Sequence, residues 1–167
     1  MLVMLGGLPG VGKSALADLL ATRLPAVVVS VDPIEDAIVR SGIAMSFETG
    51  LAAYLVGAEI ARTQLRNGLA VIADAANYLE VGRATWREAA ERVGAEVKVI
   101  EVICSDERLH RSRLESRQRG LIAYPELPWD DVLARRAQTE PWPEDRLVLD
   151  SVEPLDRNVE KAIAFLR

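Results

Sequence analysis

One short segment carries residues whose types and spacing are those of a phosphate-binding loop. Its sequence, GLPGVGKS, matches the pattern G-x-x-x-x-G-K-[ST] at every fixed position. Glycines let successive backbone N–H groups turn toward a β-phosphate, the lysine neutralises charge on the β- and γ-phosphates, and the final hydroxyl can ligate magnesium. We therefore predict a nucleotide site formed by Gly7, Leu8, Pro9, Gly10, Val11, Gly12, Lys13 and Ser14.

The chain lacks the segments that two other classes of phosphate-loop protein use. A GTPase carries an Asn/Thr-Lys-x-Asp segment that binds guanine and an Asp-x-x-Gly switch after the third strand, and neither is present. A mechanical ATPase usually has an acidic pair at the end of an apolar strand, where this chain has the single Asp74, and 167 residues leave no room for a further helical lid domain. Both classes are therefore disfavoured.

Transfer to a hydroxyl needs a carboxylate that orients or deprotonates the acceptor. Asp32 ends the second predicted strand, at the sheet edge that also carries the phosphate loop, and is our candidate base. A second interpretation exists, because Asp32, Pro33 and Glu35 have the N-cap, N1 and N3 spacing of a capping box. A helix cap needs no substrate, so the sequence leaves both roles open.

A second polar segment, Asp74 to Asn77, follows the third predicted strand at the same edge. We expect Asp74 to hold magnesium through water or to bind substrate, and we place Asn77 and Arg83 with Asp32 on the substrate side. The alternative is that Asp and Asn are here simply good turn residues.

Arginines crowd the interval 108–119, which we predict to be helical. Arg113 and Arg117 would then be i, i+4 neighbours on one face and could close over the phosphates. The alternative is a solvated face balanced by acidic neighbours. The interval 120–142, with its prolines and a helical stretch at 129–139, is predicted to be a mobile lid that carries Arg135 and Arg136, the whole lid spanning about 113–143.

The elements that must position these residues form a single α/β domain. Hydrophobic residues make up 50% of the chain, enough for one core, and apolar runs alternate with amphipathic stretches, as in a parallel sheet flanked by helices. Strands are predicted at 2–5, 26–30, 69–73, 97–103 and 146–149. The clearest helices are predicted at 47–67 and 155–165.

Charge and composition exclude several classes of protein. The net charge of −5 is the opposite of a general nucleic-acid-binding footprint, so a local site must bind any anionic ligand. The single Cys104 and single His110 exclude a disulfide framework and a Cys/His zinc cluster, and we expect Cys104 to be buried and His110 to be exposed. No apolar window is long enough for a membrane span and no export signal is visible, so we expect a cytoplasmic protein.

The order of the motifs resembles the predicted ATP-dependent P-loop kinases, which include relatives of polynucleotide kinase, chloramphenicol phosphotransferase and the zeta toxins. The likeness runs from Leu2 to the last predicted helix. It implies a three-layer P-loop NTPase fold, with a five-stranded parallel sheet of order 2-3-1-4-5, helices on both faces and a small helical lid. It also implies ATP and Mg²⁺ as cofactors. Position by position, the phosphate and magnesium residues match Lys13 and Ser14, the acceptor base matches Asp32, and the lid arginines match Arg113 or Arg117.

One position departs from this family pattern. Relatives of polynucleotide kinase have an arginine three residues after the base, where this chain has Glu35. Together with the acidic balance, this favours a small neutral or cationic acceptor over a nucleic-acid end. We therefore expect a kinase that moves the γ-phosphate of ATP to a hydroxyl of a small molecule. The alternatives are a nucleotide-binding regulatory or assembly module that hydrolyses ATP slowly, and a toxin-type kinase acting on a nucleotide sugar.

Overall fold

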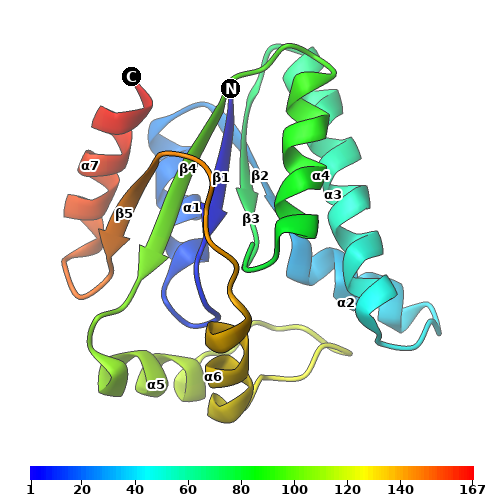
Figure 1. Ribbon diagram of the computed structural model, residues 1–167, viewed down its shortest axis with the longest axis vertical. Coiled ribbons are helices and arrows are strands. Elements are labelled where there is room, and N and C mark those ends of the chain that lie inside the picture. Colours follow the sequence, from blue (N-terminus) through cyan, green and yellow to red (C-terminus); the bar gives the residue numbers. More distant parts are fainter.

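Five parallel strands form the central sheet of the computed structural model, which describes residues 1–167 (Figure 1). In space they follow the order β2-β3-β1-β4-β5, which confirms the expected topology. The register places Leu5 beside Asp74 and Gly6 beside Glu101, so the carboxyl ends of the central strands lie at one edge. The strands are β1 (Leu2–Gly6), β2 (Ala26–Ser30), β3 (Ala70–Asp74), β4 (Val97–Ile103) and β5 (Arg146–Asp150).

Helices cover both faces of the sheet, as expected. α1 and α7 pack together on one face, and α3 and α4 pack together on the other, with α2 against α3 (Figure 1). None of the helices combines the length and apolar composition that crossing a membrane requires. The helices are α1 (Lys13–Arg23), α2 (Val31–Arg40), α3 (Phe47–Arg66), α4 (Glu80–Glu91), α5 (Glu107–Ser116), α6 (Trp129–Gln138) and α7 (Leu155–Leu166).

The core on the α3–α4 side is organised around Trp86, which is fully buried. Its ring packs so closely on α3 that a Cβ added at Gly57 would lie 2.8 Å from it. The ring nitrogen of Trp86 donates to the Asn77 side chain at 3.2 Å, so the packing of α4 is coupled to the turn after β3. This close packing holds the turn after β3 in a fixed place at the carboxyl edge.

A smaller layer, formed by α5 and α6, lies beyond the carboxyl edge of the sheet (Figure 1). Leu114, Trp129 and Val132 form its own small core. His110 is 1% exposed, so the expectation that it faces solvent was wrong. Its Nε2 lies 2.8 Å from the Pro9 carbonyl oxygen and its ring packs edge-on against Trp129. The layer is therefore fastened directly to the phosphate loop.

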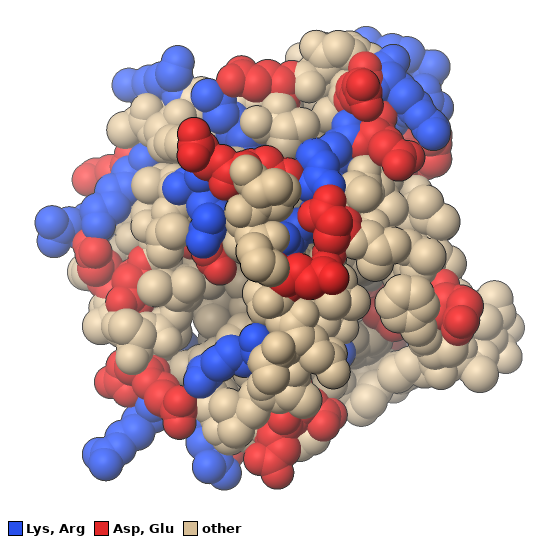
Figure 2. Space-filling view, viewed as in Figure 1, with Lys and Arg blue, Asp and Glu red and all other residues tan.

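The surface carries charges of both signs. On the face shown in Figure 2, basic and acidic side chains are interspersed, without a continuous basic patch. Such a surface is unlike the single-sign patch that nucleic-acid binding requires.

Candidate active site

The loop between β1 and α1 can be formed only with glycine at particular positions. Gly7, Gly10 and Gly12 have φ angles of 133°, 88° and 101°, which side-chain-bearing residues rarely adopt. At Gly7 an added Cβ would also lie 2.1 Å from the Val102 carbonyl oxygen. Gly12 is the N-cap of α1, so the positive end of that helix faces the loop. The observed strand, loop and helix are the setting that phosphate binding needs.

Lys13 lies at the floor of this loop and is 9% exposed. Its Nζ donates to the Leu8 carbonyl oxygen at 3.1 Å and has no carboxylate within ion-pair distance. Burial lowers the pKa of Lys13 below the usual lysine value, whereas the more distant charges of Asp74 and Asp32 act to raise it. A buried ammonium group without a direct counter-charge is suited to bind an anion such as phosphate.

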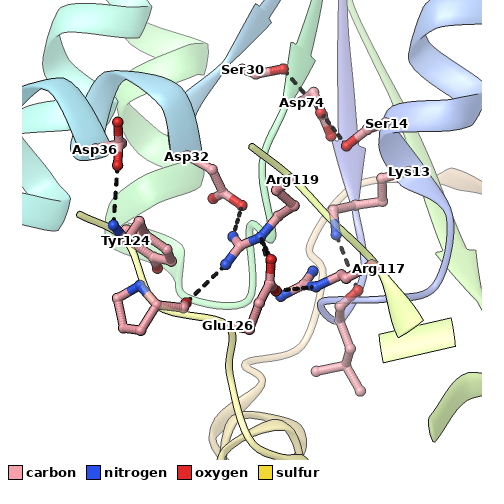
Figure 3. A network of polar contacts seen from close by, with 12 residues as sticks. Lys13, Ser14, Ser30, Asp32, Asp36, Asp74, Arg117, Arg119, Tyr124 and Glu126 are labelled. Atoms are coloured by element: carbon pink, nitrogen blue, oxygen red, sulfur yellow. Dashed lines mark hydrogen bonds and ion pairs between the residues drawn. The ribbon is translucent and has the colours of Figure 1, made fainter. Parts of the chain in front are cut away.

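Ser14, the residue after Lys13, contacts the end of β3. Ser14 Oγ donates to Asp74 Oδ2 at 2.7 Å, and Ser30 Oγ donates to the same oxygen at 3.0 Å (Figure 3). These are hard oxygen donors of the kind Mg²⁺ prefers. With a nucleotide bound, its phosphates and water would complete the ligands of such an ion.

Asp32 lies inside α2 and does not cap it. The helix begins at Val31 with Ser30 as its N-cap, so the capping-box interpretation was wrong by two positions. The Asp32 carboxylate accepts a hydrogen bond from Arg119 Nη1 at 2.8 Å (Figure 3). Because its side chain remains 46% exposed, it can also be reached from the cavity.

A single cavity of about 880 Å³ joins the phosphate loop to Asp32. Its floor is the loop and the ends of β2 and β3, and its walls are the turn after β5 and the segment between α5 and α6. Basic residues outnumber acidic ones around it, although the whole chain is acidic. The predicted site residues that line it are Pro9, Gly10, Gly12, Lys13, Ser14, Asp32, Asp74, Arg113 and Arg117.

The two predicted lid arginines do not share a helix face. α5 ends at Ser116, and Arg117 has extended backbone angles, so the expected i, i+4 pairing was wrong. Arg113 donates to the backbone and side-chain oxygens of Ser151 at 2.9–3.1 Å. Arg117 Nε bonds Glu126 at 2.7 Å, while its buried Nη2 has no partner. Burial lowers the pKa of Arg117.

The sequence analysis missed Arg119 as a site residue. It lies in the lid loop, which we define as residues 117–128, and it reaches Asp32, 87 residues away in sequence. Its Nε also pairs with Glu126 at 3.1 Å and its Nη2 donates to the Pro125 carbonyl at 2.9 Å. Spacing along the chain does not predict a contact over this distance. The only signal in the sequence is that Arg119 lies in an arginine-rich segment.

Asp36 was also missed, and it fastens the lid loop to α2. One carboxylate oxygen accepts three consecutive backbone N–H groups, from Ile122 at 2.9 Å, Ala123 at 2.7 Å and Tyr124 at 3.1 Å. The other oxygen pairs with Arg40 at 2.9 Å. Hydrogen bonding, most strongly from Ala123, lowers the pKa of Asp36. Its signal in the sequence is only its place four residues after Asp32, on the same helix face.

Asn77 and Arg83 have structural roles, which corrects their placement on the substrate side. Both are fully buried. The Asn77 side chain donates to Leu5 at 2.5 Å and accepts from Trp86. Arg83 donates only to backbone carbonyls of residues 77, 78, 140 and 141, and its guanidinium stacks on Trp142. The hydrogen bonds of both side chains are therefore made within the fold.

Comparisons with known proteins agree with this architecture. The family model described as AAA domain matches residues 2–139. A sugar kinase from Janibacter sp. HTCC2649 has a TM-score of 0.73 at 20% identity, covering 99% of this chain and 93% of that one. The Mycobacterium tuberculosis APS kinase CysC, in complex with AMPPNP and APS, has a TM-score of 0.69 at 18% identity, with 99% and 96% covered.

Chaetomium thermophilum Kti12, in complex with ADP-AlF3, has a TM-score of 0.72 at 19% identity and covers 100% of both chains. At these identities the likeness establishes the fold. No curated protein matches the sequence significantly.

Proposed function

The chain belongs to the AAA domain family, and from its cavity we propose that it is an ATP-dependent phosphotransferase acting on a hydroxyl of a small molecule. One observation carries this proposal. The phosphate loop with Lys13 and the carboxylate of Asp32 open into the same cavity, under arginines of the lid loop. A binding module needs the loop, whereas a carboxylate facing it is what phosphoryl transfer to a hydroxyl requires.

At the phosphate end, the loop and the start of α1 bind the β- and γ-phosphates of ATP, with Lys13 as the nearest cation. Ser14 and Asp74 are the residues that would hold Mg²⁺, because their oxygens lie together at the end of β3. When bound, Mg²⁺ neutralises charge on the phosphate oxygens. The nucleotides named in the two complexes above support ATP as the donor.

At the other end, Asp32 orients the acceptor hydroxyl and takes its proton. The acceptor oxygen then bonds to the γ-phosphorus, the bond from that phosphorus to its bridging oxygen breaks, and ADP leaves. Arg119 occupies one carboxylate oxygen of Asp32, and the other oxygen is the one that the hydroxyl would approach. Arg117, with one nitrogen unpartnered, supplies a cation toward the transferred group.

The test is ADP release from ATP and Mg²⁺ across hydroxylated metabolites, antibiotics, nucleosides and oligonucleotide ends. Lys13→Ala is the inactive variant. Lys98→Ala, which removes a lysine of β4 that pairs with Glu96, is the matched control. We expect one class of compound to raise ADP release in the wild type and in Lys98→Ala only. A flat response in spite of measurable ATP binding would contradict the proposal.

A second candidate is a nucleotide-binding regulatory or assembly module with slow ATP hydrolysis. The ion pair between Arg119 and Asp32 favours it, because one oxygen of the carboxylate that an acceptor needs already has a partner within the protein. Such a module would hydrolyse ATP faster with a protein partner and would not respond to small hydroxyl compounds. The same assay therefore separates the two functions.

A further inference from the structure

Arg135, on α6, differs from the other arginines that line the cavity. Arg117 and Arg119 pair with carboxylates of Glu126 and Asp32, and Arg113 is bonded to Ser151. Arg135 forms no ion pair with any carboxylate. Its guanidinium is only partly exposed, so it is a cation that faces the cavity without a direct counter-charge.

Aromatic residues hold this guanidinium in place. It lies over the Tyr78 ring, 5.5 Å from the ring centre. Tyr124 lines the same cavity; burial acts to lower the pKa of Arg135, but Tyr124 and the charge of Asp32 raise it. Tyr124 is itself fixed, because its backbone N–H is bonded to Asp36 and its ring lies 5.0 Å from Arg119 (Figure 3). An aromatic ring positions a guanidinium without neutralising it.

Arg135 lines the cavity together with Asp32 and Tyr124. Its charge acts on Asp32 and Glu35 of α2, on Tyr54 of α3 and on Tyr124 of the lid loop, and it also acts to lower the pKa of Lys13 in the phosphate loop. An acceptor whose hydroxyl reaches Asp32 therefore has the rest of its body within range of Arg135.

The charges at this end leave an anion to be supplied. Asp32 is already paired with Arg119. Glu35 is 8% exposed and forms no ion pair with Arg135, and burial together with the charge of Asp32 raises its pKa. Arg135 is then the cation without a partner. A planar guanidinium with free N–H groups matches a carboxylate or a phosphate in two parallel hydrogen bonds.

We propose that Arg135 binds an anionic group, a carboxylate or a phosphate, on the acceptor, so that the substrate class is a small hydroxylated anion. This inference rests on the proposed kinase function and revises the expectation of a neutral or cationic acceptor that Glu35 suggested. Arg135 of α6 supplies the positive charge that relatives with an arginine at the position of Glu35 have on α2.

The test uses compounds matched in their hydroxyl groups and different in charge. One series is glycerol, glycerate and glycerol 3-phosphate, and the other is glucose, gluconate and glucose 6-phosphate. ADP release is measured with each, and binding of each is measured by calorimetry in the presence of AMPPNP. The carboxylate and phosphate members of each series distinguish the two sources of negative charge. We expect an anionic member to bind at least about tenfold more tightly than its neutral counterpart.

Arg135→Gln removes the charge, and Arg136→Gln is the matched control, since its neighbour Arg136 pairs with Glu107 outside this cavity. Arg135→Gln should raise KM for the anionic acceptor at least about tenfold while leaving KM for ATP within about twofold. Arg136→Gln should change neither value. Arg135→Lys should recover part of the affinity, because it restores the charge without the planar fork.

Two results would overturn this inference while leaving the kinase intact. One is wild-type turnover of neutral members as efficiently as anionic ones. The other is a loss of kcat in Arg135→Gln with KM unchanged, which would place Arg135 on the transferred phosphate. Conversely, anion binding that needs Arg135 but gives no ADP release would uphold the anion site and contradict the kinase. If no anion binds in an Arg135-dependent way, the inference is wrong.

Discussion

At its phosphate end the cavity is formed by the loop before α1 and the turn after β5, whereas at its acceptor end it is formed by side chains from α2, the lid loop and α6. The first depends on backbone shape, with glycines at positive φ. The second depends on pairs of side chains far apart in sequence, such as Arg119 with Asp32. Changes at the first end should therefore remove nucleotide binding and all that follows, and changes at the second should remove only transfer.

The largest effect on nucleotide binding is expected from Gly7→Ala. Its Cβ would meet the Val102 carbonyl oxygen at 2.1 Å, so the loop must move away from β4. Gly68→Ala is the matched control, because Gly68 also has a positive φ but nothing lies near its Cβ. We expect Gly7→Ala to weaken ATP binding at least about tenfold in calorimetry, and Gly68→Ala to cost only about 1–2 kcal/mol of stability. Equal ATP affinity in both variants would contradict the claim that ATP binding depends on the backbone shape of the phosphate loop.

A smaller effect, confined to the acceptor end, is expected from Asp36→Ala. Three N–H groups of the lid loop would lose their common acceptor, so Tyr124 and Arg119 would no longer be held over Asp32. We expect kcat/KM for the acceptor to fall about tenfold, with ATP affinity within about twofold, and trypsin to cut faster after Arg117 and Arg119. Asp36→Asn keeps an acceptor oxygen, so its kcat/KM and its rate of proteolysis should lie between those of Asp36→Ala and the wild type. Unchanged proteolysis would show that this contact does not hold the lid.

This contrast also explains what could be predicted from the sequence. The phosphate loop was predictable because its glycines, lysine and serine lie at fixed spacing in one short segment, and the strands were predictable from apolar periodicity. The strand order came from the family resemblance alone. Asp32 was correctly placed at the sheet edge, but its helix position was two residues off. The end of α5 at Ser116 was missed, since the run of arginines continues past it without a breaking residue. The partners of Asp32 and Asp36 were not predictable, because they lie almost 90 residues away in sequence and meet α2 only in the folded chain.

A stability effect at the acceptor end is expected from Glu35→Gln. Burial raises the pKa of Glu35. At a pH above the usual glutamate pKa, the charged carboxylate therefore lowers the stability of the folded state. The variant should therefore unfold at a higher temperature than the wild type at pH 7–8, by about 2–4 °C per kcal/mol gained, and the gain should vanish as the pH falls to about 4. Glu48→Gln is the control of opposite sign, because a hydrogen bond from Ser46 lowers the pKa of Glu48. A constant difference across pH would contradict the account.

The smallest effect is expected behind the phosphate loop, at His110. Burial lowers the pKa of His110, so its contribution to stability is complete above the unfolded value of about 6.5 and is lost as the pH falls below it. We expect the unfolding temperature of the wild type to fall more steeply between pH 7 and 5 than that of His110→Gln, which can still donate to the Pro9 carbonyl. If the unfolding temperatures of the two proteins changed in parallel with pH, the titration of His110 would not contribute to the pH dependence of stability.

The central claim is that both ends of the cavity serve one reaction, and Asp32→Asn tests it most directly. Acceptor-stimulated ADP release and ATP binding are measured on the same preparations, with Asp131→Asn, an exposed aspartate of α6, as the matched control. We predict that Asp32→Asn lowers ADP release by about 10²–10⁴-fold with ATP affinity unchanged, and that Asp131→Asn does neither. Wild-type turnover in Asp32→Asn would contradict the claim and leave Asp32 only as the partner of Arg119.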